Sequence, residues 1–218
     1  GCGKTTTTRV LVKLLEAMGL KVLLAAPTGR AAQRMTDVIG SESKTIHRLL
    51  EYNFRKGGFT RKDENPLDCD LLIIDEASMI DIILMYHLVK ALADTTRIIF
   101  VGDIHQLPSV GPGNVLNDMI ESRAFPVITL NEIYRQSRDS RIIVNAHKIN
   151  EGIIPDFPAD QGDTDFYFIE QENPEKILDI IITLVQRRIP GKFGFDPIDD
   201  IQVLTPMHKG VVGAENLN

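Results

Sequence analysis

Short runs of aliphatic residues alternate along the chain with longer segments of helical periodicity. The runs have the length and composition of strands, and they predict strands at Val22–Ala26, Leu71–Asp75, Arg97–Gly102 and Val127–Leu130. Between them the helical pattern predicts Thr5–Met18 and Arg30–Ile39, each followed by a glycine that can end a helix in the left-handed conformation. This alternation is typical of βαβ units, so it predicts an α/β fold with a mostly parallel sheet.

Burial can also be predicted from the apolar pattern. Two of the runs, Leu71–Ile74 and Ile98–Val101, are apolar at every position, which predicts strands that are buried on both faces by covering helices. One such helix is expected to present a single apolar face, formed by Ile80, Ile83, Leu84, Leu88, Ala91 and Leu92.

A change in composition predicts a domain boundary near residue 150. A helix is predicted at Arg141–Asn150, and Glu151–Thr164 is rich in Pro, Asp and Gly and has no periodicity, as in a linker. We therefore expect one domain over residues 1–150, and the linker and start of a second domain over residues 151–218. The second domain is predicted to begin with a strand, a helix capped by Asn173, and another buried strand, at Phe166–Ile169, Pro174–Arg188 and Ile201–Thr205.

Composition and charge exclude several classes of protein. The chain has 218 residues, 43% of them hydrophobic, with no apolar run near the roughly 20 residues that cross a bilayer. Only Cys2 and Cys69 occur, too few for a disulfide framework, so we expect a cytoplasmic protein without a membrane partner. The net charge of −6 argues against a protein that coats nucleic acid by bulk attraction, but a local basic groove stays possible.

A phosphate-binding sequence opens the chain. Gly1-Cys2-Gly3-Lys4-Thr5 precedes a predicted helix and matches the last part of a P-loop, in which backbone N–H groups surround phosphate. The candidates for nucleotide binding are Gly1, Gly3, Lys4, Thr5 and Thr6. Lys4 is expected to reach the β- and γ-phosphates of ATP, and Thr5 to bind Mg²⁺. The alternative for this short string is an ordinary capped helix.

Two acids follow the most apolar predicted strand. Asp75 and Glu76 come directly after Leu71–Ile74, and ligands of open parallel sheets gather at the carboxyl ends of the strands. Asp75 is a candidate Mg²⁺ ligand, and Glu76 is a candidate to orient or deprotonate an attacking water. The alternative is an acidic first turn that interacts with the dipole of the following helix.

A third strand also ends in polar residues. Asp103 and Gln106 follow Ile98–Val101 in the sequence Gly102-Asp103-Ile104-His105-Gln106-Leu107-Pro108. Asp103 is a second acid near the expected metal and nucleotide. Gln106 is uncharged and suits a sensor that contacts the γ-phosphate without binding it tightly. Alone, this segment could equally be a polar turn closed by Pro108.

In this order the three segments resemble the first three motifs of superfamily 1 helicases. The amino-acid sequences of several segments are similar to those of the RecD branch of that superfamily. These segments are Ala25–Ala32, Lys44–Leu50, Asp75–Ser78, Gly102–Gly111 and Ile201–Gly210. The resemblance implies a RecA-like P-loop NTPase domain followed by the start of a second RecA-like domain.

The resemblance assigns further roles to individual residues. It implies contacts with single-stranded DNA for Pro27, Thr28, Gly29, Arg30 and His47. The alternatives are a solvated Arg30 in the first turn of a helix and an ordinary surface or packed histidine at His47.

Tyr134-Arg135-Gln136 resembles the fourth motif of the same helicases. The resemblance implies that Arg135 reaches the γ-phosphate, where an arginine stabilises developing charge. The alternative is a surface salt bridge.

Together these features predict an ATP-dependent DNA helicase motor that couples hydrolysis of Mg-ATP to translocation on single-stranded DNA, in recombination or repair. The resemblance alone implies 5′ to 3′ movement and a possible association with other subunits of a recombination exonuclease. Two alternatives stay open: an RNA-directed helicase of the same superfamily, and a non-catalytic module for assembly or nucleic-acid binding. Because the sequence begins inside the P-loop and contains no counterpart of the family's final motifs, we expect weak nucleotide binding and little unwinding by this chain alone.

Overall fold

The computed structural model describes residues 3–53, 55, 57–130, 140–157 and 164–218. The chain divides into two compact units. The first contains Gly1–Asp139 and Ala146–Ile153, and the second contains Ser140–Asn145 and Ile154–Asn218. The predicted domain boundary at residue 150 stays a prediction.

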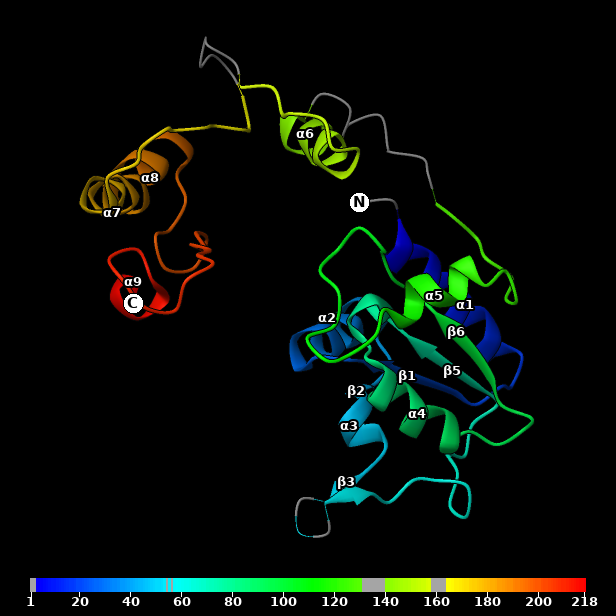
Figure 1. Cartoon of the computed structure of the whole chain (residues 1–218). Helices are drawn as coiled ribbons and strands as arrows, with labels where there is room; N and C mark the ends of the chain where they lie inside the picture. The colour runs from blue at the N-terminus through cyan, green and yellow to red at the C-terminus, as the bar shows by residue number, and fades with distance from the viewer. Residues whose placement is uncertain (1–2, 54, 56, 131–139, 158–163) are drawn as a thin grey trace. The chain divides into compact units, whose positions relative to one another are not determined.

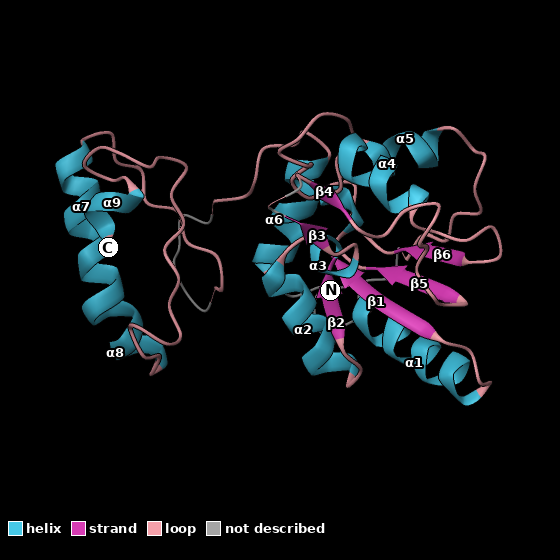
Figure 2. Ribbon diagram, turned by 90° about the horizontal axis from the view of Figure 1, so that it is seen from below, coloured by secondary structure: helices cyan, strands magenta, loops and turns pink. Residues whose placement is uncertain are grey.

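A four-stranded parallel sheet forms the centre of the first unit (Figures 1 and 2). Its strands lie in the order β2-β1-β5-β6, with bounds β2 Ser43–Thr45, β1 Val22–Ala26, β5 Leu71–Ile74 and β6 Arg97–Phe100. Leu24 of β1 is in register with Ile73 of β5, which is in register with Ile99 of β6. The predicted α/β fold with a parallel sheet is therefore confirmed, as are three of the four strands predicted for this unit.

Alternate residues of the strands face two separate hydrophobic layers, because side chains of a strand point to opposite faces in turn. On one face Leu24, Leu71 and Ile73 pack against Val12 of helix α1 (Lys4–Ala17) and Met35 of helix α2 (Gly29–Ile39).

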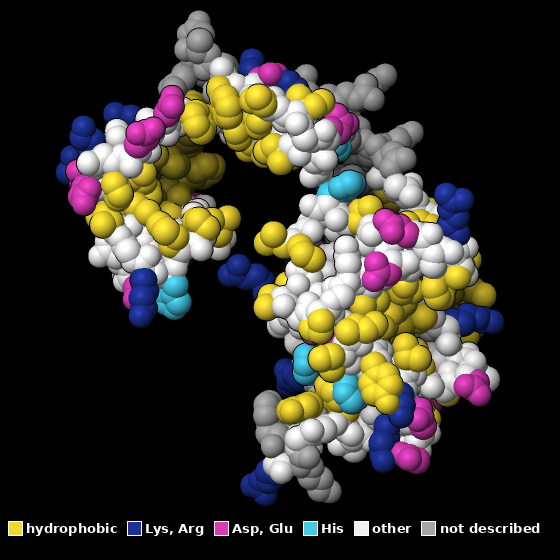
Figure 3. Space-filling view, viewed as in Figure 1, with side chains coloured by type: hydrophobic (Ala, Val, Ile, Leu, Met, Phe, Trp, Pro, Cys, Tyr) yellow, Lys and Arg dark blue, Asp and Glu magenta, His cyan; other side chains and the backbone are white. Residues whose placement is uncertain are grey.

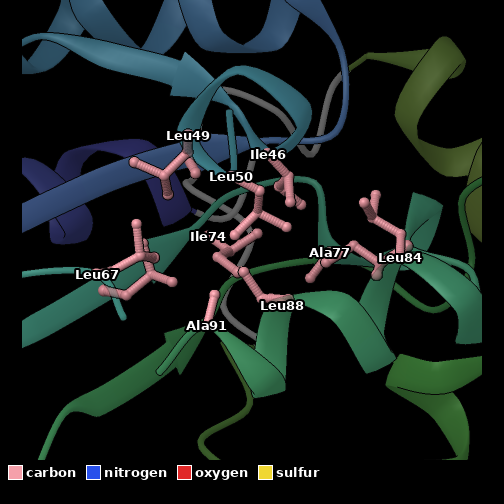
Figure 4. Close-up of a cluster of buried hydrophobic side chains, with 12 residues drawn as sticks. Ile46, Leu49, Leu50, Leu67, Ile74, Ala77, Leu84, Leu88 and Ala91 are labelled. Carbon is pink, nitrogen blue, oxygen red and sulfur yellow. The ribbon is translucent and has the colours of Figure 1, made fainter. Parts of the chain in front are cut away.

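On the other face Ala25, Leu72 and Ile74 pack against α3 (Ile46–Leu49) and α4 (Ile82–Lys90), as Figure 4 shows in part. Figure 2 shows α1 and α4 on opposite sides of the sheet. Leu72, Ile73 and Ile74 are completely buried, and burial of each such side chain contributes about 1.5–3 kcal/mol.

Side-chain caps and glycines define the helix ends. The hydroxyl of Thr28 accepts a hydrogen bond from the N–H of Ala31 at 3.2 Å at the start of α2, and α2 ends at Gly40 with φ of 86°. The carboxylate of Asp81 accepts the N–H of Leu84 at 2.7 Å and caps α4. The two helices predicted between the strands are confirmed within the usual uncertainty of one or two residues at each end.

Several short elements in the first unit were not predicted. They are β2, α3, the hairpin of β3 (Tyr52–Asn53) and β4 (Gly58–Phe59), the 3₁₀ turn η1 (Ala77–Met79), and α5 (Val115–Glu121). Most are too short to show a period of hydrophobicity, and the turn η1 follows the strand end directly.

The predicted strand at Val127–Leu130 is wrong. These residues form no strand, and Ile128 is 90% exposed. An isolated extended segment has no hydrogen-bonding neighbour, and no strand of the described chain pairs with this one.

Two predictions of burial are also wrong. Residues of β6 are exposed or half-buried, because β6 lies at the end of the strand order in the described sheet. Ile83 is 57% exposed, whereas Ile80, Leu84, Leu88 and Ala91 of the predicted apolar face are buried and Leu92 is partly buried against them.

Helices and loops make up the described part of the second unit. Helix α6 (Arg141–Asn150), which was predicted, crosses the division between the units. The predicted helix at Pro174 is confirmed as α7 (Pro174–Thr183), and the side-chain Oδ1 of Asn173 caps it by accepting the N–H of Lys176 at 3.0 Å. It continues through a π-helical turn, η3 (Leu184–Arg188), into α8 (Ile189–Phe193), and a short α9 (Ala214–Leu217) follows.

The strands predicted in this unit, Phe166–Ile169 and Ile201–Thr205, are wrong. Leu204 is 83% exposed, and the described part of the unit has no neighbouring strand with which either segment pairs. The start of a second RecA-like domain therefore stays a prediction. Among all described residues, no helix combines the length and apolar character needed to span a bilayer.

Candidate nucleotide site

The parallel strands bring three predicted segments to one edge of the sheet. Pro27 and Thr28 follow β1, Asp75 and Glu76 follow β5, and Gly102 and Asp103 follow β6. Carboxyl ends of parallel strands lie at the same edge, where ligands of open α/β sheets bind. Lys4, at the start of α1, reaches the same edge through its contact with Asp103.

Lys4 is held by the loop that follows β6. Its Nζ donates to Oδ2 of Asp103 at 3.0 Å and to the carbonyl of Gly102 at 3.4 Å. The pKa of Asp103 lies below its ordinary value: burial, the largest single influence, raises it, but hydrogen bonds from Lys4 and the N–H of His105 outweigh burial. The predicted phosphate-binding lysine and the predicted third-motif acid therefore lie in direct contact.

The start of α1 suits an anion. Gly3 has a φ of 79°, in the left-handed region that glycine tolerates, and the first turn contains no acidic residue. Such a helix start presents unpaired N–H groups and a positive partial charge. Thr8 is buried and its hydroxyl donates to the carbonyl of Lys4 at 3.0 Å, which fixes the first turn. Thr5 is half-buried and Thr6 is exposed, whereas Gly1 lies outside the described residues.

Glu76 has a strained backbone. Its φ of 52° and ψ of 40° are left-handed, a conformation that costs a residue other than glycine about 1–3 kcal/mol. Its N–H donates to Oδ1 of Asp75 at 2.9 Å. Ala77 N–H donates to the carbonyl of Val101 at 2.9 Å, and Val101 N–H donates to the carbonyl of Ile74 at 2.7 Å. The neighbouring strands thus impose this conformation on a half-buried carboxylate.

The oxygen donors of this edge fit a magnesium ion chemically. Asp75 and Thr5 supply carboxylate and hydroxyl oxygens, and Mg²⁺ prefers oxygen ligands contributed by one or two carboxylates together with substrate phosphates. Both side chains are half-buried.

The loop after β6 packs closely against η1 and α5 at Gly102 and contains hydrogen bonds of its own. An added Cβ at Gly102 would lie 2.6 Å from Leu116 Cδ2 and 3.2 Å from the backbone N of Ser78, so a side chain there would need Leu116 to move and would press on the backbone of η1. Further along, the Ser109 hydroxyl lies 3.0 and 3.1 Å from the carbonyl oxygens of Gly111 and Gly113 and can donate its single hydrogen to either. Gln106 donates its N–H to the carbonyl of Asp103 at 3.1 Å, and its side chain is exposed.

Arg135 and its neighbours Tyr134 and Gln136 lie outside the described residues, so the role predicted for Arg135 stays a prediction.

The segment expected to contact DNA follows β1 at the same edge. Pro27 and Thr28 are half-buried, and Gly29 and Arg30 are exposed. Gly29 has an ordinary negative φ, and nothing lies within 4 Å of a Cβ added to it, so the chain itself does not require glycine there. The exposed face of this segment is therefore free to receive a ligand closely.

His47 is exposed on α3 beside a hollow of about 760 Å³. Its ring centroid lies 5.8 Å from that of Phe59 and 6.2 Å from that of Tyr52, and Phe59 lies 4.8 Å from His87. Figure 3 shows histidine and hydrophobic side chains gathered side by side in the lower part of this unit. Sequence reasoning found only His47, because these rings come from four separate elements and share no local pattern.

A family profile described as an AAA domain, AAA_19, matches residues 1–112, just over half of the chain. The chain belongs to this family. It is 38% identical over its full 218 residues to the ATP-dependent RecD2 DNA helicase of Deinococcus radiodurans, and it covers 28% of that protein. In an alignment of 145 positions that covers 56% of the chain, it is 37% identical to the RecBCD enzyme subunit RecD of Haemophilus influenzae, of which it covers 23%. The resemblance to RecD-like superfamily 1 helicases is confirmed.

A solved structure supports the AAA-domain fold. The Pif1 helicase from Bacteroides, crystallised in complex with ADP-AlF3 and single-stranded DNA, aligns with 88% of this chain and 46% of its own chain, with a TM-score of 0.51 and 24% identity. The RecA-like P-loop fold predicted from the sequence agrees with this likeness. The chain spans about a quarter of the length of the curated relatives named above.

Proposed function

We propose that this chain carries the nucleotide site of an ATP-dependent DNA helicase motor. One observation supports the proposal most directly: Lys4 at the start of α1 contacts Asp103 at the strand edge that also carries Asp75 and Glu76. A phosphate-binding lysine, a candidate metal ligand and a candidate base at one sheet edge are the parts that phosphoryl transfer from a nucleotide requires.

Each residue has a distinct role in this proposal. Lys4 leaves Asp103 to bind the β- and γ-phosphates of ATP, assisted by the N–H groups at Gly3 and the start of α1. Asp75 and Thr5 hold Mg²⁺, which neutralises phosphate charge when bound. The carboxylate of Glu76 accepts a proton from the attacking water. Gln106 contacts the γ-phosphate, and Arg135 stabilises charge that develops on it.

Single-stranded DNA is the proposed track. Pro27, Thr28, Gly29 and Arg30 offer backbone and hydroxyl groups and one guanidinium, which bind phosphates without reading sequence. His47 adds a ring at the rim of the aromatic hollow. By analogy with the RecD-like relatives, we propose 5′ to 3′ translocation, a role in recombination or repair, and a possible association with other subunits.

DNA-stimulated ATP hydrolysis by the protein expressed from its complete reading frame tests this function. Glu76→Gln and Lys4→Ala should each lower turnover by at least about 100-fold, as expected when a preorganised charged group is lost. Glu42→Gln is the matched control, because Glu42 is exposed just before β2, at the opposite edge of the sheet.

Two results would contradict the proposal. Equal rates for wild type and Glu76→Gln would favour a non-catalytic module. Stimulation by RNA and not by DNA oligonucleotides would favour an RNA-directed motor.

A further inference from the structure

Ser78 has a buried hydroxyl without a hydrogen-bonding partner. Its side chain is 6% exposed, and its Oγ makes no hydrogen bond to any part of the chain that the structure describes. Buried polar groups in folded proteins are nearly always paired, and an unpaired one costs stability. The position therefore needs a physical explanation.

The surroundings of Ser78 are the two segments that carry the proposed chemistry. Ser78 lies two residues after Glu76, in the turn η1. Its backbone packs against Gly102 so closely that an added Cβ there would lie 3.2 Å from the Ser78 nitrogen. Gly102 begins the loop that carries Asp103 and Gln106, so Ser78 lies where the turn after β5 meets the loop after β6.

Lys4 is the donor that now holds this loop. Its Nζ contacts the carbonyl of Gly102 and the carboxylate of Asp103. In the proposed function, Lys4 gives up these contacts when it binds the phosphates of a nucleotide, because Asp103 and phosphate compete for the same ammonium group. When Lys4 turns to phosphate, the loop loses its donor at the point where Ser78 lies against it.

We propose that Ser78 is a positioning residue whose hydroxyl donates a hydrogen bond to the loop that begins at Gly102 once Lys4 has turned to the nucleotide. This inference rests on the proposed ATPase function. The exchange of donors fixes Gln106 and Glu76 relative to each other only when nucleotide is bound. The unpaired hydroxyl is the cost of keeping that donor available.

The test uses Ser78→Ala, the size-matched weak donor Ser78→Cys, and the control Thr96→Val. Thr96 lies at the other end of β6, where its hydroxyl donates to the carbonyl of Cys69 at 3.0 Å. Three quantities are measured in the complete protein: the Tm without nucleotide, the rise in Tm caused by a non-hydrolysable ATP analogue, and kcat and KM for DNA-stimulated hydrolysis.

Ser78→Ala should keep or raise the Tm without nucleotide, reduce the analogue-induced rise, and lower kcat by about tenfold, the effect of losing roughly one hydrogen bond. For the analogue-induced rise in Tm and for kcat, Ser78→Cys should give values between those of wild type and Ser78→Ala. Thr96→Val should lower the Tm without changing the response to nucleotide.

Two outcomes would overturn the inference. If Ser78→Ala matches wild type in kcat and in the analogue-induced rise, the hydroxyl has no role. If it loses Tm and turnover together, its role is structural. Both outcomes leave the proposed function standing as long as wild type hydrolyses ATP, whereas absence of DNA-stimulated hydrolysis in wild type contradicts the proposed function itself.

Discussion

Lys4 and Asp103, 99 positions apart in the sequence, form an ion pair of 3.0 Å that joins the start of α1 to the loop after β6. The pair connects the two ends of the candidate nucleotide site. Asp103 thus contacts the lysine that is expected to bind phosphate, and nucleotide has to compete with it.

The first prediction concerns pH. The folded-state pKa of Asp103 is lowered, so its ionised form contributes stability that is present above the ordinary carboxylate pKa of about 3.9 and is lost as pH falls through the lower folded value. Asp103→Asn should therefore be less stable than wild type at pH 7, and the difference should shrink as the pH falls below the ordinary carboxylate pKa of about 3.9. Urea midpoints measured from pH 7 to pH 3 check this. A difference that stays constant over that range would show that ionisation of Asp103 is not its source.

The second prediction concerns Gly102. Gly102→Ala should destabilise the fold by about 1–3 kcal/mol, because the new methyl group meets Leu116 and the backbone of η1. It should also lower ATP turnover, since the new methyl group displaces the loop that bears Asp103 and Gln106. Gly191→Ala is the matched control, because its added Cβ meets nothing within 4 Å. Equal denaturation midpoints for the two variants would show that the close approach at Gly102 is not required.

The third prediction separates stability from activity at Glu76. Glu76→Gly should raise the free energy of unfolding by about 1 kcal/mol, because glycine relieves the left-handed strain, and should abolish ATP hydrolysis. Arg123→Gly also replaces a residue of positive φ, 56°, outside the proposed site. It should stabilise the protein and leave hydrolysis unchanged. Chemical denaturation and an ATPase assay of both variants check this, and hydrolysis retained by Glu76→Gly would remove Glu76 from the proposed mechanism.

The fourth prediction concerns DNA binding. Arg30→Ala should weaken binding of single-stranded oligonucleotides of any sequence and reduce the slope of log K against log salt by about 1, as expected for loss of one phosphate contact. Arg97→Ala is the control, because Arg97 is exposed at the start of β6, at the edge of the sheet away from Thr28. Titrations at several salt concentrations measure both slopes. Equal slopes for wild type and Arg30→Ala would show that Arg30 does not contact a DNA phosphate.

Much of the fold could be predicted because its determinants are local. Leu71–Ile74 is apolar throughout and is followed directly by two acids, so both the burial of β5 and the position of Asp75 follow from a few adjacent residues. A glycine-lysine pair before a helix likewise locates Lys4.

Other features depend on neighbours that are distant in the sequence. Whether Val127–Leu130 or Ile201–Thr205 becomes a strand depends on a partner with free backbone groups, which an apolar run does not reveal. Ile83 is exposed and its neighbour Leu84 is buried because of the way helix α4 is rotated about its own axis relative to the sheet. The apolar character of the two residues does not reveal that rotation. The unpaired hydroxyl of Ser78 and the left-handed backbone of Glu76 appear only once β5 and β6 lie side by side.

The aromatic hollow around Phe59 has a practical consequence. The chain contains no tryptophan and only four tyrosines; Tyr52 lines the hollow, and Tyr86 contacts His87, which lines it too. Intrinsic emission from two of the four tyrosines therefore comes from this part of the first unit. A molecule that enters the hollow should change that emission without any attached label, which provides an optical readout for this surface.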